Sequence, residues 1–200
     1  MDKHNNRKGS VTDMAEKFAV NDYVIYGKSG LCFIKEIKKM LMAGTRAEYY
    51  ILNAVNGNDV TIYVPCNNEK LVGKMRRPMT KAEIDEILDA AKGQQIKWID
   101  NNSARNEAFQ QITDSENYRD WVLLVGCLYM KKKEKHASGK HLASHDENTL
   151  KLLEKLIQDE FSYSLDIDKY KVSEYIQNKA ISPQKRLRLF SIQWDKKAKK

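Results

Sequence analysis

The sequence lacks any apolar run long enough to cross a membrane, and it has few cysteines. The longest apolar stretch, Trp121–Met130, has ten residues with Gly126 inside it, whereas a spanning helix needs about 20. The N-terminal region contains no apolar segment of the kind that a secretory signal requires. Cys32, Cys66 and Cys127 are isolated from one another, which argues against a disulfide framework or a zinc ribbon. We therefore expect a cytoplasmic protein with reduced thiols and no membrane contact.

The sequence also lacks the short motifs of common catalytic sites. It has no G-x-x-x-x-G-K-S/T, G-x-G-x-x-G, H-E-x-x-H or G-x-S-x-G, the patterns that bind phosphate or metal or carry a nucleophile. The nearest approach to a metal site is His136, His141 and His145, but lysines surround these residues and a helix is predicted to begin between the last two. Adjacent carboxylates such as Asp85 and Glu86 point about 100° apart on a helix and form no acid–base pair. We expect no enzyme activity, no metal, no cofactor and no small-molecule substrate.

The excess of positive charge is confined to the C-terminal end. The chain has 35 basic and 27 acidic residues, a net charge of +8. Residues 183–200 contain seven basic residues and one acidic residue, so they supply +6 and leave +2 for residues 1–182. Any polyanion that the body of the protein binds must therefore contact a local patch of cations.

The residue pattern divides the chain into a β-rich part and a helical part. Short segments rich in Val, Ile and Tyr predict strands at 22–26, 31–38, 47–55 and 60–64. Turn signals separate them, of which Asn56–Asp59 is the strongest because Asn and Gly tolerate positive φ. Short strands at this spacing predict a small antiparallel barrel, whose closure removes exposed strand edges.

Helical periodicity begins after Pro78, which blocks strand pairing. The first predicted helix covers 81–91 and follows a capping box at Thr80–Glu83. Ser103 is expected to cap a second helix, to about Ile112, and Ser115 a third, which contains the long apolar segment. A capping box at Ser144–Glu147 opens a fourth, and Asp168 to about Lys179 forms the last. We expect a flexible leader over 1–17, a β module over 18–77, a helical domain over 80–182 and a flexible basic tail over 183–200.

Two features of the predicted helical domain suggest binding. Trp98 lies in a polar connection between two helices, flanked by Lys97 and later by Arg105. It is either an exposed anchor or wedge, or a staple that packs on the next helix. A cluster of lysines at the end of the apolar helix either complements the helix dipole or contacts phosphate. The cluster consists of Lys131, Lys132, Lys133 and Lys135, with Lys140 close behind.

Several segments of the sequence together resemble a known family. Phe18–Ile34 contains the pattern V-x-D-x-V-x-Y-x-x-x-G, and Glu48–Leu52 and Val60–Pro65 follow it. This combination resembles the CarD/CdnL family of bacterial transcription regulators, and its first part is similar to the polymerase-interacting domain of the transcription-repair coupling factor. The resemblance continues through Trp98, Trp121 and the helix from Ser144, and so covers about residues 18–165.

The resemblance implies a Tudor-like barrel that binds the β subunit of RNA polymerase. It also implies a helical domain that contacts promoter DNA at the upstream edge of the transcription bubble. In the family, a Trp in the position of Trp98 wedges into the minor groove with little base specificity, and the open complex lasts longer. The implied DNA-binding residues are Trp98, Lys97, Arg105, Lys131, Lys132, Lys133, Lys135 and Lys140.

The sequence departs from the family at three positions. Met40 and Tyr63 stand where some relatives carry arginines that contact polymerase, and Glu147 stands where relatives carry a lysine. On the barrel, Lys38, Lys39 and Arg46 are expected to substitute for the missing cations. The expected polymerase-binding residues are Lys38, Lys39, Met40, Arg46 and Tyr63. The alternative function is an adaptor that docks on polymerase without touching DNA.

Overall fold

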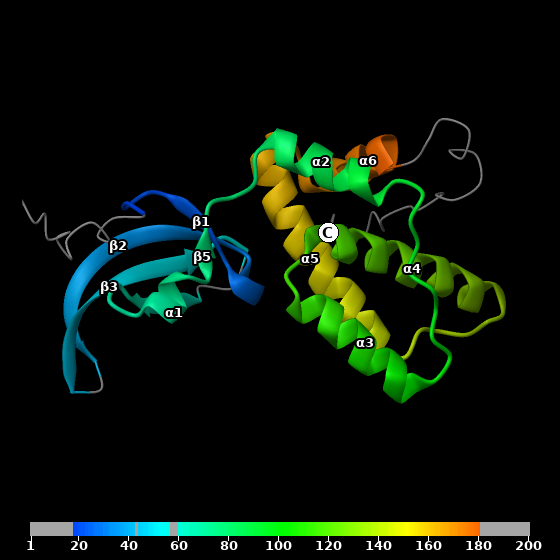
Figure 1. Cartoon of the computed structure of the whole chain (residues 1–200), viewed down its shortest axis with the longest axis horizontal. Coiled ribbons are helices and arrows are strands. Elements are labelled where there is room, and N and C mark those ends of the chain that lie inside the picture. The colour runs from blue at the N-terminus through cyan, green and yellow to red at the C-terminus, as the bar shows by residue number, and fades with distance from the viewer. Residues whose placement is uncertain (1–17, 43, 57–59, 181–200) are drawn as a thin grey trace, which may run out of the picture.

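The computed structural model describes residues 18–42, 44–56 and 60–180. Within these residues an antiparallel sheet is followed by a group of helices (Figure 1). The elements are β1 (Tyr23–Tyr26), the 3₁₀ turn η1 (Gly27–Ser29), β2 (Leu31–Met42), β3 (Thr45–Ala54), β4 (Thr61–Pro65), α1 (Glu69–Val72), β5 (Met75–Arg76), α2 (Lys81–Ala91), α3 (Asn102–Asp114), α4 (Tyr118–Ala137), α5 (Ser144–Leu165) and α6 (Lys169–Ala180). The predicted leader and basic tail lie outside the described residues.

The five strands pair in the order β4-β3-β2-β1-β5, and every pair is antiparallel. The predicted antiparallel β module is therefore confirmed. In the described part of the chain the edge strands β4 and β5 do not pair with each other, so closure into a barrel stays a prediction. A bulge between Ile34 and Glu36 shifts the pairing of β2 with β3. Such a bulge exchanges the faces to which the following side chains point.

One face of the sheet is packed into a hydrophobic core. Val24, Cys32, Ile34, Leu52 and Val64 are all fully buried there, as expected where alternate residues of a strand share a face. The three cysteines of the chain are free thiols. Burial raises the pKa of the Cys32 thiol to about 11, which keeps it protonated near neutral pH.

The turn between β1 and β2 depends on two glycines. Gly27 and Gly30 have φ values of 48° and 71°, in the left-handed region that side chains rarely adopt. Gly30 also lies against the helices, because a Cβ built on it would come 3.1 Å from Cδ2 of Leu156 on α5. The turn therefore forms part of the contact between the sheet and the helices.

The predicted helices are present, but asparagines cap two of them where serines were expected. α2 begins at the predicted capping box, with both reciprocal hydrogen bonds formed. The Asn101 side chain, and not Ser103, caps α3 by accepting a hydrogen bond from the Ala104 N–H. Asn117 caps α4, whereas Ser115 ends α3. An Asn carbonyl accepts the same backbone hydrogen bonds as a Ser hydroxyl.

The capping box predicted at Ser144 is wrong. The N-cap residue of α5 is Ala143, and no side chain caps this end of the helix. Ser144 is already inside the first turn, and the carboxylate of Glu147 accepts a hydrogen bond from Lys132 on α4 instead. The ion pair with α4 thus takes the group that a capping box would have used.

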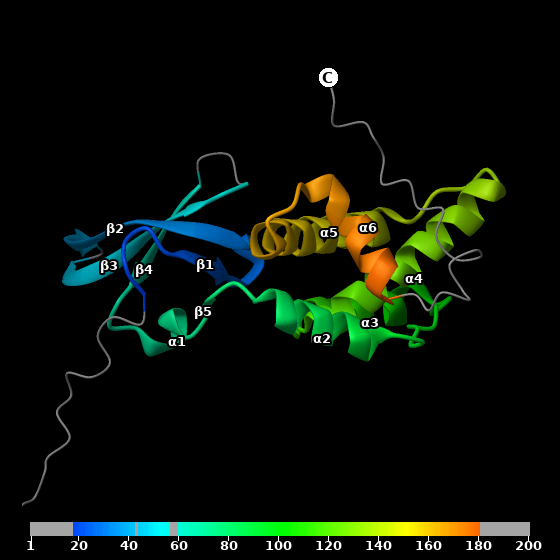
Figure 2. The same cartoon turned by 90° about the horizontal axis from the view of Figure 1, so that it is seen from above.

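A second hydrophobic core lies among the helices. It includes Ile84, Phe109, Trp121, Leu153 and Phe161, and it is separate from the core of the sheet. The prediction that Trp121 is a core residue is confirmed, since it is 2% exposed. Figure 2 shows α5 running from beside the sheet into the helical part. Among the described residues, no helix has both the length and the apolar character that a membrane span requires.

Candidate functional site

Trp98 lies half-buried in the connection between α2 and α3. Its ring packs edge-on against Phe109, with ring centroids 6.0 Å apart and an interplanar angle of 69°. Lys131 of α4 places its Nζ 5.3 Å from the centroid of the indole, within the range of a cation–π contact. The indole therefore combines a packing contact with a cationic neighbour, and it is not sealed inside the core.

Arg105 is a buried structural residue, which corrects its expected role as a DNA contact. Its side chain is 2% exposed and pairs with fully buried Asp146 of α5, with Nη2–Oδ2 and Nε–Oδ1 distances of 3.0 and 3.1 Å. Nη1 donates to the carbonyl oxygens of Ile99 and Asp100 at 2.8 and 3.2 Å. The guanidinium also lies over Trp98, 4.3 Å from Cζ to the ring centroid. Arg105 thus holds the segment beside Trp98 and offers no free surface to a phosphate.

The predicted lysines gather around the end of α4, but several interact within the chain. Lys131 pairs with Glu134 at 3.0 Å, and Lys132 pairs with Glu147 at 3.1 Å. Lys140 lies exposed in the α4–α5 connection, and Lys97 is exposed next to Trp98. Lys133 is exposed on α4 and also has an interaction, whereas Lys135 is half-buried. The surface around the end of α4 is therefore cationic, but Glu134 and Glu147 neutralise part of its charge.

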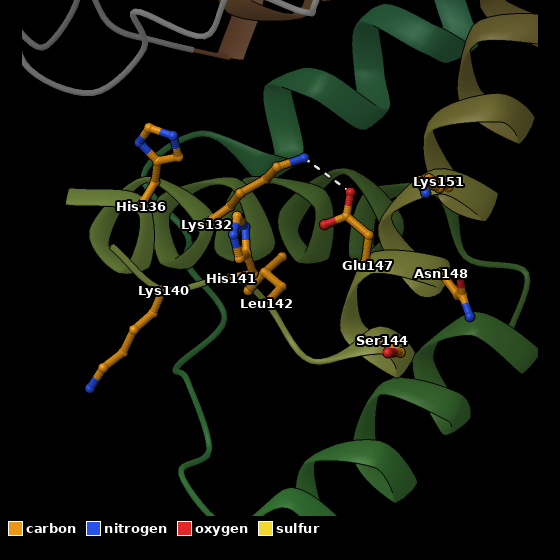
Figure 3. Close-up of a pocket in the computed structure, with 9 residues that line it drawn as sticks. All are labelled: Lys132, His136, Lys140, His141, Leu142, Ser144, Glu147, Asn148 and Lys151. Atoms are coloured by element: carbon orange, nitrogen blue, oxygen red, sulfur yellow. Dashed lines mark hydrogen bonds and ion pairs between the residues drawn. The ribbon is translucent and has the colours of Figure 1, made fainter. Parts of the chain in front are cut away.

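An open hollow of about 510 Å³ lies where α4 ends and α5 begins (Figure 3). Three lysines and two histidines line it, against a single glutamate that is already paired with Lys132. The lining residues are Lys132, His136, Lys140, His141, Leu142, Ser144, Glu147, Asn148 and Lys151. The first turn of α5 adds the positive end of a helix dipole. The hollow is therefore suited to an anion.

Lys151, His136 and His141 were not predicted as part of this surface. Lys151 lies four residues after Glu147 on α5, so both project from one side of the helix. That spacing could have revealed it, whereas the approach of His136 and His141 depends on the path of the α4–α5 connection. No group of three or more metal-ligating side chains in the described residues is arranged to hold an ion.

The predicted polymerase-binding residues divide between the two faces of the sheet. Lys38, Met40 and Tyr63 pair with Tyr49, Ala47 and Ile51, which alternate along β3 and therefore share a face. Tyr63 is 43% exposed on this face.

Lys39 and Arg46 have the opposite register and belong to the other face, near the β2–β3 hairpin. Lys38 pairs with Glu36 at 3.5 Å, so it is already engaged in an ion pair. We call the surface of Lys38, Met40 and Tyr63 the outer face of the sheet.

The comparisons with known proteins identify the N-terminal part of the chain. Residues 18–79 match the model of the CarD-like/TRCF RID domain family. The match spans every strand of the sheet and ends before α2. It indicates a domain that interacts with RNA polymerase and acts in transcription. The comparison with curated proteins found no match for the chain.

Proposed function

We propose that the protein regulates transcription by binding RNA polymerase through its sheet and promoter DNA through its helices. The β subunit is the proposed polymerase contact, and the upstream edge of the open bubble is the proposed DNA contact. The protein stabilises the open complex and catalyses no reaction. The observation that carries the proposal is Trp98, a half-buried indole beside Lys131 in a chain whose sheet matches an RNA polymerase-interacting domain.

The outer face and the edge of the sheet support docking on polymerase. Among the described strands β4 pairs only with β3, so no strand covers its other edge. An exposed edge strand can pair with a strand of a partner protein. Exposed Tyr63 lies on this strand, and aromatic side chains are enriched among the residues that dominate binding. The proposed contact is therefore the β4 edge together with the outer face.

The surroundings of Trp98 support a contact with DNA that is already open. Inserting an apolar ring between base pairs costs a few kcal/mol of unstacking. At the edge of a bubble the polymerase has already separated the strands on one side, so less unstacking remains. Lys131 and Lys97 lie next to the indole, where they can contact the backbone. The wedge then selects a state of the DNA and needs little base specificity.

The hollow at the α4–α5 connection supports a second contact with the DNA backbone. Three lysines line it, and its one carboxylate, that of Glu147, is already paired with Lys132. The hollow therefore offers a positive surface to phosphate. With only a few such contacts, binding to free duplex should be weak and sensitive to salt. Docking on polymerase would raise the local concentration of this surface at the promoter, so a weak contact suffices.

The test is the replacement of Trp98 by Ala in promoter-opening assays with the cognate polymerase. We expect the lifetime of the open complex to fall about tenfold, since stacking of a base on an aromatic ring contributes about 1–3 kcal/mol. Loss of the Phe109 contact should cost about 1 kcal/mol of stability. Tyr170→Ala is the control, because Tyr170 is an exposed aromatic residue on α6. An unchanged lifetime with a large drop in thermal stability would show that Trp98 is only a staple.

An adaptor without DNA contact is the competing function, and the ion pairs of the lysines favour it. Lys131 and Lys132 both have carboxylate partners within the chain. Footprinting of the promoter complex distinguishes the two functions. Protection at the upstream edge of the bubble that Trp98→Ala removes supports the wedge, and a footprint identical to that of polymerase alone supports the adaptor.

A further inference from the structure

Three acids of α5 are buried, and two of them, one near each end, pair with an arginine from another part of the chain. Asp146 and Glu160 are both 0% exposed. Asp146 binds Arg105, which holds the segment of Trp98, and Glu160 binds Arg76 on strand β5 of the sheet. The two acids are separated by about 21 Å along the axis of α5, given a rise of ~1.5 Å per residue. One helix therefore connects the sheet to the candidate DNA contact.

The pair at the sheet end has a bidentate geometry. Arg76 donates from Nη1 to Oε1 of Glu160 at 2.6 Å and from Nη2 to Oε2 at 2.7 Å. The Met79 N–H donates to the same Oε1 at 2.9 Å. The guanidinium also lies over the ring of Tyr118 on α4, 5.2 Å from its centroid. Parallel hydrogen bonds of this kind fix orientation as well as distance.

Other contacts restrict the same junction. The rings of Tyr23 on β1 and Tyr163 on α5 lie 4.7 Å apart. Lys28 of η1 forms an ion pair with Asp114 of α3 at 2.5 Å. Figures 1 and 2 show α5 meeting the sheet near β1 and continuing into the helical part. The sheet is thus attached to α5 through Glu160 and Tyr163 and to α3 through Asp114.

At the other end of α5, the Asp146–Arg105 pair determines where Trp98 lies. Arg105 bonds the two carbonyl groups that follow Trp98 in the chain and packs on the indole itself. Both arginines are held by acids of one continuous helix. The position of Trp98 relative to the outer face of the sheet is therefore transmitted through α5.

We propose that α5 is a rigid strut and that Arg76 and Glu160 are positioning residues that fix the docking face of the sheet relative to Trp98. This inference rests on the proposed function, because it assigns a role to the distance between its two contacts. A preset geometry makes the second contact effectively intramolecular at high local concentration. A loosened junction lowers that concentration although both binding surfaces remain intact.

The test compares Glu160→Gln with Asp159→Asn in the full chain. Asp159 is the neighbouring residue of α5, 4% exposed, and pairs with Lys169 of α6 at 2.5 Å. Both changes remove a buried negative charge from the same helix, but only Glu160 connects to the sheet. Thermal unfolding, affinity for polymerase without promoter, and open-complex lifetime at saturating protein are measured for each variant.

We expect both variants to melt at a lower temperature and to bind polymerase as the wild type does. Only Glu160→Gln should shorten the open-complex lifetime, by about threefold or more, since only it lowers the effective concentration at the promoter. Equal lifetimes for the two variants would overturn the strut. If Glu160→Gln does not fold, Arg76→Lys replaces it, since lysine keeps the charge and gives up the bidentate geometry. A wild-type lifetime in Arg76→Lys would likewise overturn the strut.

Trp98→Ala, measured in the same assay, distinguishes failure of the proposed DNA contact from failure of the strut. A normal lifetime in Trp98→Ala refutes the proposed DNA contact, and the strut fails with it. A shortened lifetime in Trp98→Ala, with no difference between Glu160→Gln and Asp159→Asn, refutes the strut alone.

Discussion

Glu154 of α5 should make the stability of the helical part depend on pH. Its Oε1 is buried and has no hydrogen-bond partner among the described residues. Burial raises the pKa of this carboxyl to about 7, from an ordinary value of about 4.5. A carboxyl without a partner prefers its neutral form, because ionisation in an apolar environment is costly. Glu154 should therefore stay protonated in the folded protein under conditions where the unfolded chain has released the proton.

Proton linkage determines whether the free energy of unfolding rises or falls with pH. The folded state holds the Glu154 proton more tightly between the two pKa values, so the stability that Glu154 contributes is greatest below pH 4.5 and is lost as the pH rises through 7. At ~1.4 kcal/mol per pH unit, the interval sets an upper limit of about 3 kcal/mol. Because the side chain is only half-buried, solvent screening reduces this to about 1–2 kcal/mol.

The assay is urea unfolding of the wild type and Glu154→Gln between pH 5 and 8, monitored by helical circular dichroism. Glutamine has nearly the same shape and does not titrate. The free-energy difference between the two proteins should therefore shift by about 1–2 kcal/mol in favour of the variant as the pH rises. Glu107→Gln, at an exposed position of α3, should show no such trend. A constant difference for Glu154→Gln across this range would refute the reasoning.

Two further changes test the packing against α5. Gly30→Ala should lower stability by about 1–3 kcal/mol in thermal unfolding. The loss should exceed that of Gly44→Ala, because both glycines have positive φ but only Gly30 faces Leu156. Equal losses would contradict the close contact. Asp146→Asn should cost about 3–5 kcal/mol in urea unfolding, because it leaves the buried charge of Arg105 without its partner. A loss below about 1 kcal/mol would mean that water reaches the guanidinium.

Alternation and helical periodicity were sufficient to predict most elements, because burial on one face determines both patterns. The helix over 81–91 and the strands from Tyr23 to Pro65 follow from them. The caps were harder to place, because several polar residues stand before each helix and any of them can accept the orphan N–H groups. The sequence alone therefore does not distinguish Asn101 and Asn117, which are the caps, from the serines nearby.

The faces of the sheet could not be predicted from spacing alone. Counted in steps of two from buried Ile34, Lys38 would point inward and Lys39 outward. The bulge between Ile34 and Glu36 reverses this assignment, since one extra residue shifts every later side chain to the other face. No local sequence pattern predicts the bulge. Lys38 and Lys39 were predicted to contact the same partner, but in the observed register they lie on opposite faces of the sheet.

The structural role of Arg105 could not be predicted from the sequence for a similar reason. From the sequence it is a basic residue near Trp98, which fits a phosphate contact as well as a structural one. Its partner Asp146 lies 41 residues away on α5, and only the packing of α3 against α5 brings the two together. The burial of the pair distinguishes it from the lysines nearby, which remain at the surface.

The carboxylates among the surface lysines give the proposed DNA contact its selectivity. Glu134 and Glu147 occupy Lys131 and Lys132 in the free protein, so a phosphate must displace a partner before it is bound. Exposed pairs contribute only about 0–1 kcal/mol, which a phosphate held nearby by a docked polymerase readily offsets. A phosphate on free duplex arrives without that advantage and must also compete with salt. The ion pairs that weaken binding to free duplex DNA thus restrict the contact to promoters that polymerase already occupies.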